Sequence, residues 1–323
     1  INLNFMSFIQ IFIGLALLFF GGESLVRGAV KLAQKFKLSK LITGITIVAY
    51  GTSSPELLIT IQASLKGLSD IALGNVIGSN IANIFLVLGL VSILNPINVE
   101  KKLISFDLNY LLFASFILFA FIFTGEINYQ KGLILLIALV IFTFSTYKRH
   151  KVNGESDPML NQVDEIEEQF YFLNLTNKLA VILVVLGVFM LSFGANILVM
   201  GASELALQFG MSEAAIAVTI IAIGGSAPEL ATSVVAACRK HSDIAIGNVI
   251  GSNIFNILGV LGISSLISPI VTNSTLAIFD IWVLLFSSLL LFSFVSKKKL
   301  LSRLNGFTFL LFYSLYILWQ FIF

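Results

Sequence analysis

The feature that most constrains this chain is a segment that occurs twice, 173 residues apart. Residues 69–83 read SDIALGNVIGSNIAN and residues 242–256 read SDIAIGNVIGSNIFN. The same register extends upstream, where GTSSPE at residues 51–56 matches GGSAPE at residues 224–229. A repeat of this length indicates a duplicated structural unit, so we expect two halves with the same order of elements.

Long apolar runs indicate that both halves lie in a membrane. Hydrophobic residues make up 58% of the chain and charged residues 11%, against roughly 25% charged residues in soluble proteins, which excludes a soluble enzyme. The runs do not alternate apolar with polar residues, which excludes a transmembrane β-barrel. A membrane helix needs about 20 apolar residues. We therefore expect ten spans, near residues 5–29, 41–65, 71–94, 104–124, 130–147, 178–206, 214–237, 244–267, 276–296 and 304–323.

The basic residues give this segmentation an orientation. Of the 19 Lys and Arg residues, all but Lys66 and Lys131 fall on the side that holds the loops after the odd-numbered spans. Cytosolic loops retain an excess of positive charge, so this side is predicted to be cytosolic. Both chain termini then lie outside the cytosol, and the protein is expected in the cell membrane. The acidic stretch 148–177 becomes a cytosolic linker.

Five spans in each half have a topological consequence. Because five is odd, the second half must enter the membrane from the opposite side. We expect an all-α polytopic membrane protein of ten transmembrane helices in two inverted five-helix repeats, residues 1–147 and 178–323. The repeated motifs cover about residues 41–94 and 214–267. Many secondary transporters share this construction, with their binding site near mid-membrane.

Two carboxylates mark the candidate site. Glu56 and Glu229 occupy matching places inside apolar spans, where an ionised side chain costs about 2.5–3.5 kcal/mol. The spans at 41–65, 71–94, 214–237 and 244–267 contain no Lys or Arg. A permanent salt bridge within these helices is therefore not available, and bound cations or protons are the expected compensation.

Further oxygen atoms accompany each carboxylate. Thr52 and Ser53 share a helical side with Glu56, as Ser226 does with Glu229. The prolines that precede the two glutamates lack an N–H group, which leaves the carbonyls of Gly51 and Gly224 without their helical donor. On the following spans, hydroxyl and amide side chains recur four residues apart. The additional candidates for lining the site are Gly51, Gly224, Ser79, Asn83, Ser252 and Asn256.

Only hard oxygen donors are present, since both histidines lie in loops. Such ligands suit Ca²⁺, Na⁺ or Mg²⁺ and disfavour zinc or copper. A flexible shell of six to eight oxygens suits Ca²⁺ better than Mg²⁺, which demands tight octahedral geometry. Two carboxylates balance one divalent ion or two monovalent ions, which is the charge basis of an exchange. The expected partners are inorganic cations and the lipid bilayer. The small net charge of +2 gives no indication of nucleic-acid binding, and no cofactor or obligate protein partner is predicted.

The paired motifs GTSSPE with GNVIGSNIAN and GGSAPE with GNVIGSNIFN resemble the two α-repeats of the cation/Ca²⁺ antiporter superfamily, in particular its prokaryotic sodium/calcium exchangers. The resemblance covers essentially the whole chain. It implies alternating access, with Na⁺ influx driving Ca²⁺ extrusion. By position, it implies a Ca²⁺ site made of Glu56, Glu229 and the backbone carbonyls of Thr52 and Gly225. It also implies Na⁺ ligands among Ala49, Thr52, Ser53, Glu56, Ser79, Asn83, Ala222, Ser226, Glu229 and Ser252.

Two positions depart from the pattern of that superfamily. Gly225 stands where many relatives have Thr, so one hydroxyl is missing from the second half. Asn256 stands where some relatives, including potassium-dependent ones, have Asp, which argues against potassium co-transport. Proton-coupled exchange of Ca²⁺ is the alternative to sodium coupling. A channel is less consistent with a complete inverted repeat in one chain. An enzyme would need a nucleophile or base beside a substrate pocket, and no His or Cys lies in the core of the repeats.

Overall fold

The computed structural model describes residues 5–36, 38–98, 101–150, 175–209, 222–272, 275–298 and 300–322. Over these residues the chain is nearly all helical. The predicted cytosolic linker falls mostly on residues 151–174 and lies outside the described residues. The first part of the predicted span at 214–237 also lies outside them, because the description resumes at residue 222.

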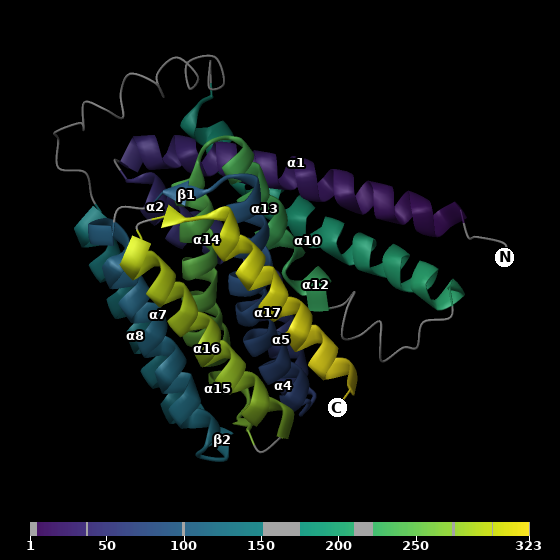
Figure 1. Ribbon diagram of the computed structural model, residues 1–323, viewed down its shortest axis with the longest axis vertical. Coiled ribbons are helices and arrows are strands. Elements are labelled where there is room, and N and C mark those ends of the chain that lie inside the picture. Colours follow the sequence, from purple (N-terminus) through teal and green to yellow (C-terminus); the bar gives the residue numbers. More distant parts are fainter. Residues whose placement is uncertain are drawn as a thin grey trace.

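Six long helices form the frame of the molecule (Figure 1). The first of them, α1, continues seven residues beyond the predicted end at residue 29. They are α1 (Phe5–Phe36), α7 (Lys101–Ile122), α8 (Tyr129–His150), α10 (Asn177–Gln208), α16 (Thr275–Lys298) and α17 (Arg303–Ile322).

The remaining helical segments are interrupted, and they carry the duplicated motifs. In the first half they are α2 (Lys40–Thr43), the π-helix η1 (Gly44–Val48), α3 (Ala49–Thr52), α4 (Ser54–Leu65), α5 (Ser69–Ala82), the π-helix η2 (Asn83–Val87) and α6 (Leu88–Leu94). In the second half they are α12 (Ala222–Gly225), α13 (Ala227–Cys238), α14 (Ser242–Phe255), the π-helix η4 (Asn256–Val260) and α15 (Leu261–Ile267). Seven continuous helical stretches of the described residues are long and apolar enough to cross a membrane.

Helices α1 and α10 run side by side and lie obliquely across the rest of the bundle (Figure 1). Glycines recur every seventh residue along both contact faces. A Cβ atom at Gly14 would lie 2.7 Å from the backbone nitrogen of Leu198, and one at Gly187 would lie 2.7 Å from that of Leu25. The two backbones therefore approach closely because these positions lack side chains. The glycines are Gly14, Gly21, Gly28, Gly187, Gly194 and Gly201.

Two very short antiparallel ladders join the halves, an addition to the predicted all-helical fold. Strand β1 (Ile97–Asn98) pairs with β4 (Leu300–Leu301), and β2 (Glu126–Ile127) pairs with β3 (Ile270–Val271). Each ladder takes one strand from each half, and the two ladders lie toward opposite ends of the bundle (Figure 1). Backbone hydrogen bonds therefore connect the two halves at both ends of the bundle.

Residues that match each other in the repeat also meet in space. The hydroxyls of Ser115 and Ser288 lie 3.2 Å apart, and the Asn253 amide donates to the Asn80 carbonyl at 3.1 Å. Both pairs are 173 residues apart in sequence. Positions that match in the sequence repeat are therefore in direct contact at two places in the described part of the chain.

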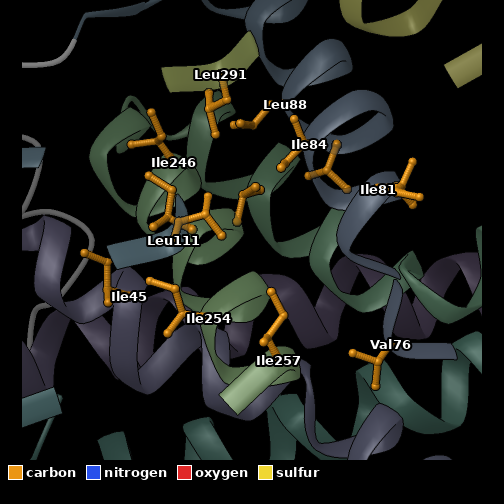
Figure 2. Packing of buried hydrophobic residues seen from close by; sticks show 14 of the residues in the cluster. Ile45, Val76, Ile81, Ile84, Leu88, Leu111, Ile246, Ile254, Ile257 and Leu291 are labelled. Atoms are coloured by element: carbon orange, nitrogen blue, oxygen red, sulfur yellow. The ribbon is translucent and has the colours of Figure 1, made fainter. Parts of the chain in front are cut away.

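The apolar core lies where the interrupted helices pack against α7 and α16. Aliphatic side chains from η1, α5, η2, α14 and η4 interdigitate there (Figure 2). Ile45, Ile84, Ile254 and Ile257 have no exposed surface. The outward faces of the long helices instead expose large apolar residues such as Phe12, Phe144 and Val185, as expected for helices that contact lipid.

Candidate ion-binding site

A break in the helix precedes each glutamate. Ser53 has φ −84° and ψ 7°, and Ser226 has φ −93° and ψ 9°, so both residues leave helical geometry. Pro55 and Pro228 follow within the first turn of α4 and α13, where a missing N–H group is tolerated. The glutamates thus lie in the first turn of their helices, where the helix dipole favours a negative charge.

The two glutamates are fully buried and interact electrostatically. Glu229 Oε1 accepts a hydrogen bond of 2.9 Å from the hydroxyl of Ser53, which belongs to the other half. Three carboxylate oxygens, both of Glu56 and Oε2 of Glu229, have no hydrogen-bond partner among the described residues. Buried carboxylate oxygens without donors are strong ligands for a cation or a proton.

A second group of oxygens lies beside the carboxylates. The hydroxyl of Thr52 lies 3.2 Å from the Ala49 carbonyl, 3.2 Å from Asn248 Oδ1 and 3.4 Å from the Ser252 hydroxyl. Ser252 also approaches the Ala49 carbonyl at 3.4 Å. All of these residues are buried, so the structure brings Ala49, Thr52 and Ser252 together.

The other residues predicted for the site make fewer side-chain hydrogen bonds within the described part of the chain. Ser79 donates to the Asn75 carbonyl at 2.6 Å. Asn83 and Asn256 begin the π-helices η2 and η4, and their buried amides have no partner among the described residues. The same holds for the Ser226 hydroxyl. Ala222 and Gly224 lie in α12, Gly225 ends it, and Gly51 lies in α3.

Four asparagines of the duplicated segment were not singled out from the sequence. Asn75 donates to the Glu56 carbonyl and to Thr60, and Asn248 donates to the Glu229 carbonyl and to Ser233. Asn80 and Asn253 are buried at the contact between repeat mates. The sequence could have identified these asparagines as candidates, because all four recur at matching places in apolar spans and buried amides in a membrane need partners.

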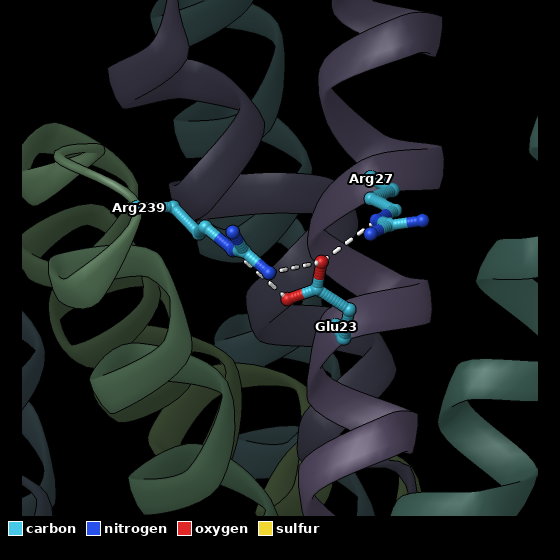
Figure 3. A network of polar contacts seen from close by, with 3 residues as sticks. All are labelled: Glu23, Arg27 and Arg239. Atoms are coloured by element: carbon cyan, nitrogen blue, oxygen red, sulfur yellow. Dashed lines mark hydrogen bonds and ion pairs between the residues drawn. The ribbon is translucent and has the colours of Figure 1, made fainter. Parts of the chain in front are cut away.

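A charged contact joins the frame to the site-bearing helices. Glu23 of α1 receives hydrogen bonds from Arg27 at 2.7 Å and from two nitrogens of Arg239 at 2.9 and 3.2 Å (Figure 3). Arg239 caps the C-terminal end of α13. The repeat mates of Glu23 and Arg239 are Asn196 and Lys66, which cannot form the same ion pair. This contact therefore exists at only one end of the molecule.

Comparison with known proteins agrees with this architecture. The sequence matches the family described as "Sodium/calcium exchanger protein" over residues 6–148 and 179–322. It is 36% identical to the "Putative antiporter CaxA" of Alkalimonas amylolytica, covering 92% of each chain. It is 31% identical to the sodium/calcium exchanger MaX1 of Methanosarcina acetivorans, covering 97% of each chain.

Solved structures of the sodium-calcium exchanger NCX_Mj share the fold. One that was soaked with Na⁺ and without Ca²⁺ superposes with a TM-score of 0.80 at 34% sequence identity, covering 97% of this chain and 98% of that one. Another, soaked with both Na⁺ and Sr²⁺, gives a TM-score of 0.79 at 33% identity. The family that these comparisons identify is one of membrane transporters rather than enzymes. The chain belongs to the sodium/calcium exchanger family, within the cation/Ca²⁺ antiporters.

Proposed function

We propose that this protein exchanges Na⁺ for Ca²⁺ across the cell membrane by alternating access, with Na⁺ influx driving Ca²⁺ extrusion. The single observation that carries the proposal is the pair of buried glutamates from two different halves. Three of their four oxygens have no donor among the described residues, and no Lys, Arg or His described in the structure forms an ion pair with either. Such a pair calls for positive charge from outside the chain.

The charge of the pair fits both ions of the exchange. One Ca²⁺ neutralises two carboxylates, and so do two Na⁺ ions, but both sets cannot fill the same oxygens together. Ca²⁺ prefers six to eight oxygen ligands in a flexible shell. Glu56 and Glu229 with the backbone carbonyls of Thr52 and Gly225 are the proposed core of that shell. Competition for the same charge couples entry of one ion to exit of the other.

The Na⁺ ligands are proposed around the same centre. The cluster of Ala49, Thr52 and Ser252 supports one such position, since its hydroxyl and carbonyl oxygens lie within 3.2–3.4 Å of one another. A matching position would draw on the other half. The full proposed set is Ala49, Thr52, Ser53, Glu56, Ser79, Asn83, Ala222, Ser226, Glu229 and Ser252, with Asn256, Gly51 and Gly224 lining the site.

The topology proposed for this function has ten spans in two inverted repeats, residues 1–147 and 178–323, joined by a cytosolic linker. Contacts between the repeat mates Ser115 and Ser288 support a two-fold relation between the halves. The two ladders support inversion, because β1 and β3 are repeat mates that lie toward opposite ends of the bundle (Figure 1). The distribution of Lys and Arg supports termini outside the cytosol.

Reconstituted protein provides the test. Proteoliposomes loaded with Na⁺ are diluted into Na⁺-free buffer containing radiolabelled Ca²⁺, and parallel vesicles carry only a pH gradient. Uptake that requires internal Na⁺ and disappears with a Na⁺ ionophore is expected. Uptake that follows the pH gradient alone would overturn sodium coupling and assign Glu56 and Glu229 to proton exchange. No Ca²⁺ uptake in either arm would overturn the proposed cargo.

A further inference from the structure

The side chain of Asn248 connects three parts of the candidate site. Its Nδ2 donates to the Glu229 carbonyl at 3.4 Å and to the Ser233 hydroxyl at 2.9 Å. Its Oδ1 lies 3.2 Å from the Thr52 hydroxyl, which belongs to the other half of the chain. Asn248 has no exposed surface, so these contacts are not shared with bulk water. One amide therefore joins α14, α13 and α3.

The repeat mate Asn75 makes only the first part of this arrangement. Its Nδ2 donates to the Glu56 carbonyl at 3.1 Å and to the Thr60 hydroxyl at 2.9 Å. These are the same two contacts that Asn248 makes with α13. The position that corresponds to Thr52 in the other half is Gly225. Because glycine has no hydroxyl, the connection between the halves through residue 225 is missing.

Close packing of backbones explains how Asn248 reaches Thr52. A Cβ atom at Gly247 would lie 2.6 Å from the Leu41 carbonyl oxygen, and one at Gly251 would collide with the Ile45 carbonyl. Helix α14 can thus press against α2, η1 and α3 only because these two positions lack side chains. Asn248 and Ser252, the next residues along, are thereby brought to Thr52.

We propose that Asn248 is a positioning residue of the ion site, which holds Thr52 of the first half against the Glu229 helix of the second, and that Gly225 deprives Asn75 of the same role. The proposal rests on the proposed function, since Thr52 and Glu229 are its ligands. A hydroxyl has one proton. Donation to Asn248 directs the Thr52 proton away from the site, so the lone pairs of its oxygen stay available to a cation.

A double-mutant cycle between Asn248→Ala and Thr52→Val tests the connection. The readouts are the Na⁺ concentration for half-maximal Ca²⁺ exchange and the Na⁺-induced rise in Tm of the purified protein in detergent. Each single change is expected to raise the half-maximal Na⁺ concentration. In the double variant, the increase in the half-maximal Na⁺ concentration is expected to be smaller than the product of the two single increases. The difference should be about two- to tenfold, the range that one hydrogen bond contributes. Additive effects would overturn the proposal.

Thr52→Ser is the conservative variant, because it keeps the hydroxyl. It is expected to preserve coupling to Asn248, which a purely structural role of the Thr52 methyl group would not do. Asn75→Ala is the matched control, since it removes the same two contacts within one half. It is expected to be additive with any change at Thr52. Coupling of Asn75 to Thr52 as strong as that of Asn248 would contradict the assignment.

A gain of function offers a second route that does not depend on Asn248→Ala folding. Nothing in the described part of the chain lies within 4 Å of a Cβ atom at Gly225, so a larger residue would not collide with any of the described residues. Gly225→Thr is expected to lower the half-maximal Na⁺ concentration by about two- to tenfold and to lose that gain when combined with Asn75→Ala. Failure of the native protein to respond to Na⁺ would overturn the proposed function instead. A normal native response with additive cycles would overturn only this inference.

Discussion

Within the candidate ion site, the two halves of this transporter differ in two ways, and the two differences have different origins. Thr52 meets Asn248 across the site, but Gly225 offers Asn75 no hydroxyl; that difference is written in the sequence and is permanent. Ser53 donates to Glu229, whereas its mate Ser226 has no partner among the described residues. Because these two residues are identical, we infer that their unequal contacts reflect the conformation. An inverted repeat can exchange such contacts between its halves when access switches sides.

The largest effect is expected where the two halves should be equally indispensable. Glu56→Gln and Glu229→Gln each remove one negative charge with little change in shape. Both are expected to lower the apparent Ca²⁺ affinity in exchange assays by at least about 30-fold, because the bound Ca²⁺ loses one of its two carboxylates and breaking a buried pair of opposite charges costs about 2–5 kcal/mol. The Tm in detergent serves as the folding control. Near-normal exchange by either variant would remove that half from the ion site.

Glycine-to-alanine changes in α1 and in α10 should destabilise the protein to a similar extent. A Cβ atom at Gly21 would lie 2.9 Å from the Leu191 nitrogen, and one at Gly194 would lie 2.8 Å from the Leu17 Cβ. Gly21→Ala and Gly194→Ala are each expected to destabilise the protein by about 1–3 kcal/mol through overpacking, measured by thermal or denaturant unfolding in detergent. Gly22→Ala is the control, because its nearest contact, at 3.4 Å, is an ordinary one on α13. Equal loss at Gly22 would argue against the close α1–α10 contact.

Variants of Ser53 and Ser226 distinguish a difference between the halves that depends on conformation from one that the sequence determines. Ser53→Ala removes the hydrogen bond to Glu229 and so disfavours the conformation described here, whereas Ser226→Ala is expected to disfavour its counterpart. The ratio of half-saturating Ca²⁺ on the two membrane faces, measured in vesicles of opposite orientation, should shift in opposite directions by about two- to tenfold. Shifts in the same direction would mean that the Ser53 contact does not depend on conformation.

The smallest effect is expected at the one-sided ion pair. Arg239→Gln breaks the contact with Glu23, whose partners Arg27 and Arg239 are about 40% exposed, so the loss in stability should not exceed about 1 kcal/mol. Lys66→Gln, at the exposed mate of Arg239, is the control and should leave Tm unchanged. Added salt should reduce the difference between the native protein and Arg239→Gln, because salt screens exposed charges.

Much of the architecture could be predicted from the sequence, because a membrane restricts the structures that a chain can form. Apolar length defined the long helices, and the recurrence of Glu56 and Glu229 located the paired carboxylates. The contacts that distinguish the halves were not predictable in this way. Thr52 with Asn248 and Glu23 with Arg239 are separated by 196 and 216 residues, so they depend on how the two halves pack. The short ladders likewise form from loops that carry no strand pattern.

The π-helices were also not visible in the sequence, and they change the phase of the helices that contain them. One extra residue in a turn rotates everything downstream by about 100°. Beyond η2, Gly89 lies against Leu310 of α17; beyond η4, Gly262 lies against Leu136 of α8. A single span therefore presents one face to the candidate site before its π-helix and another to a frame helix after it. Five residues separate Asn83 from Gly89, and five separate Asn256 from Gly262; two of the five differ between the halves, but the number is the same. The number of residues sets the angle, so both halves turn their spans alike.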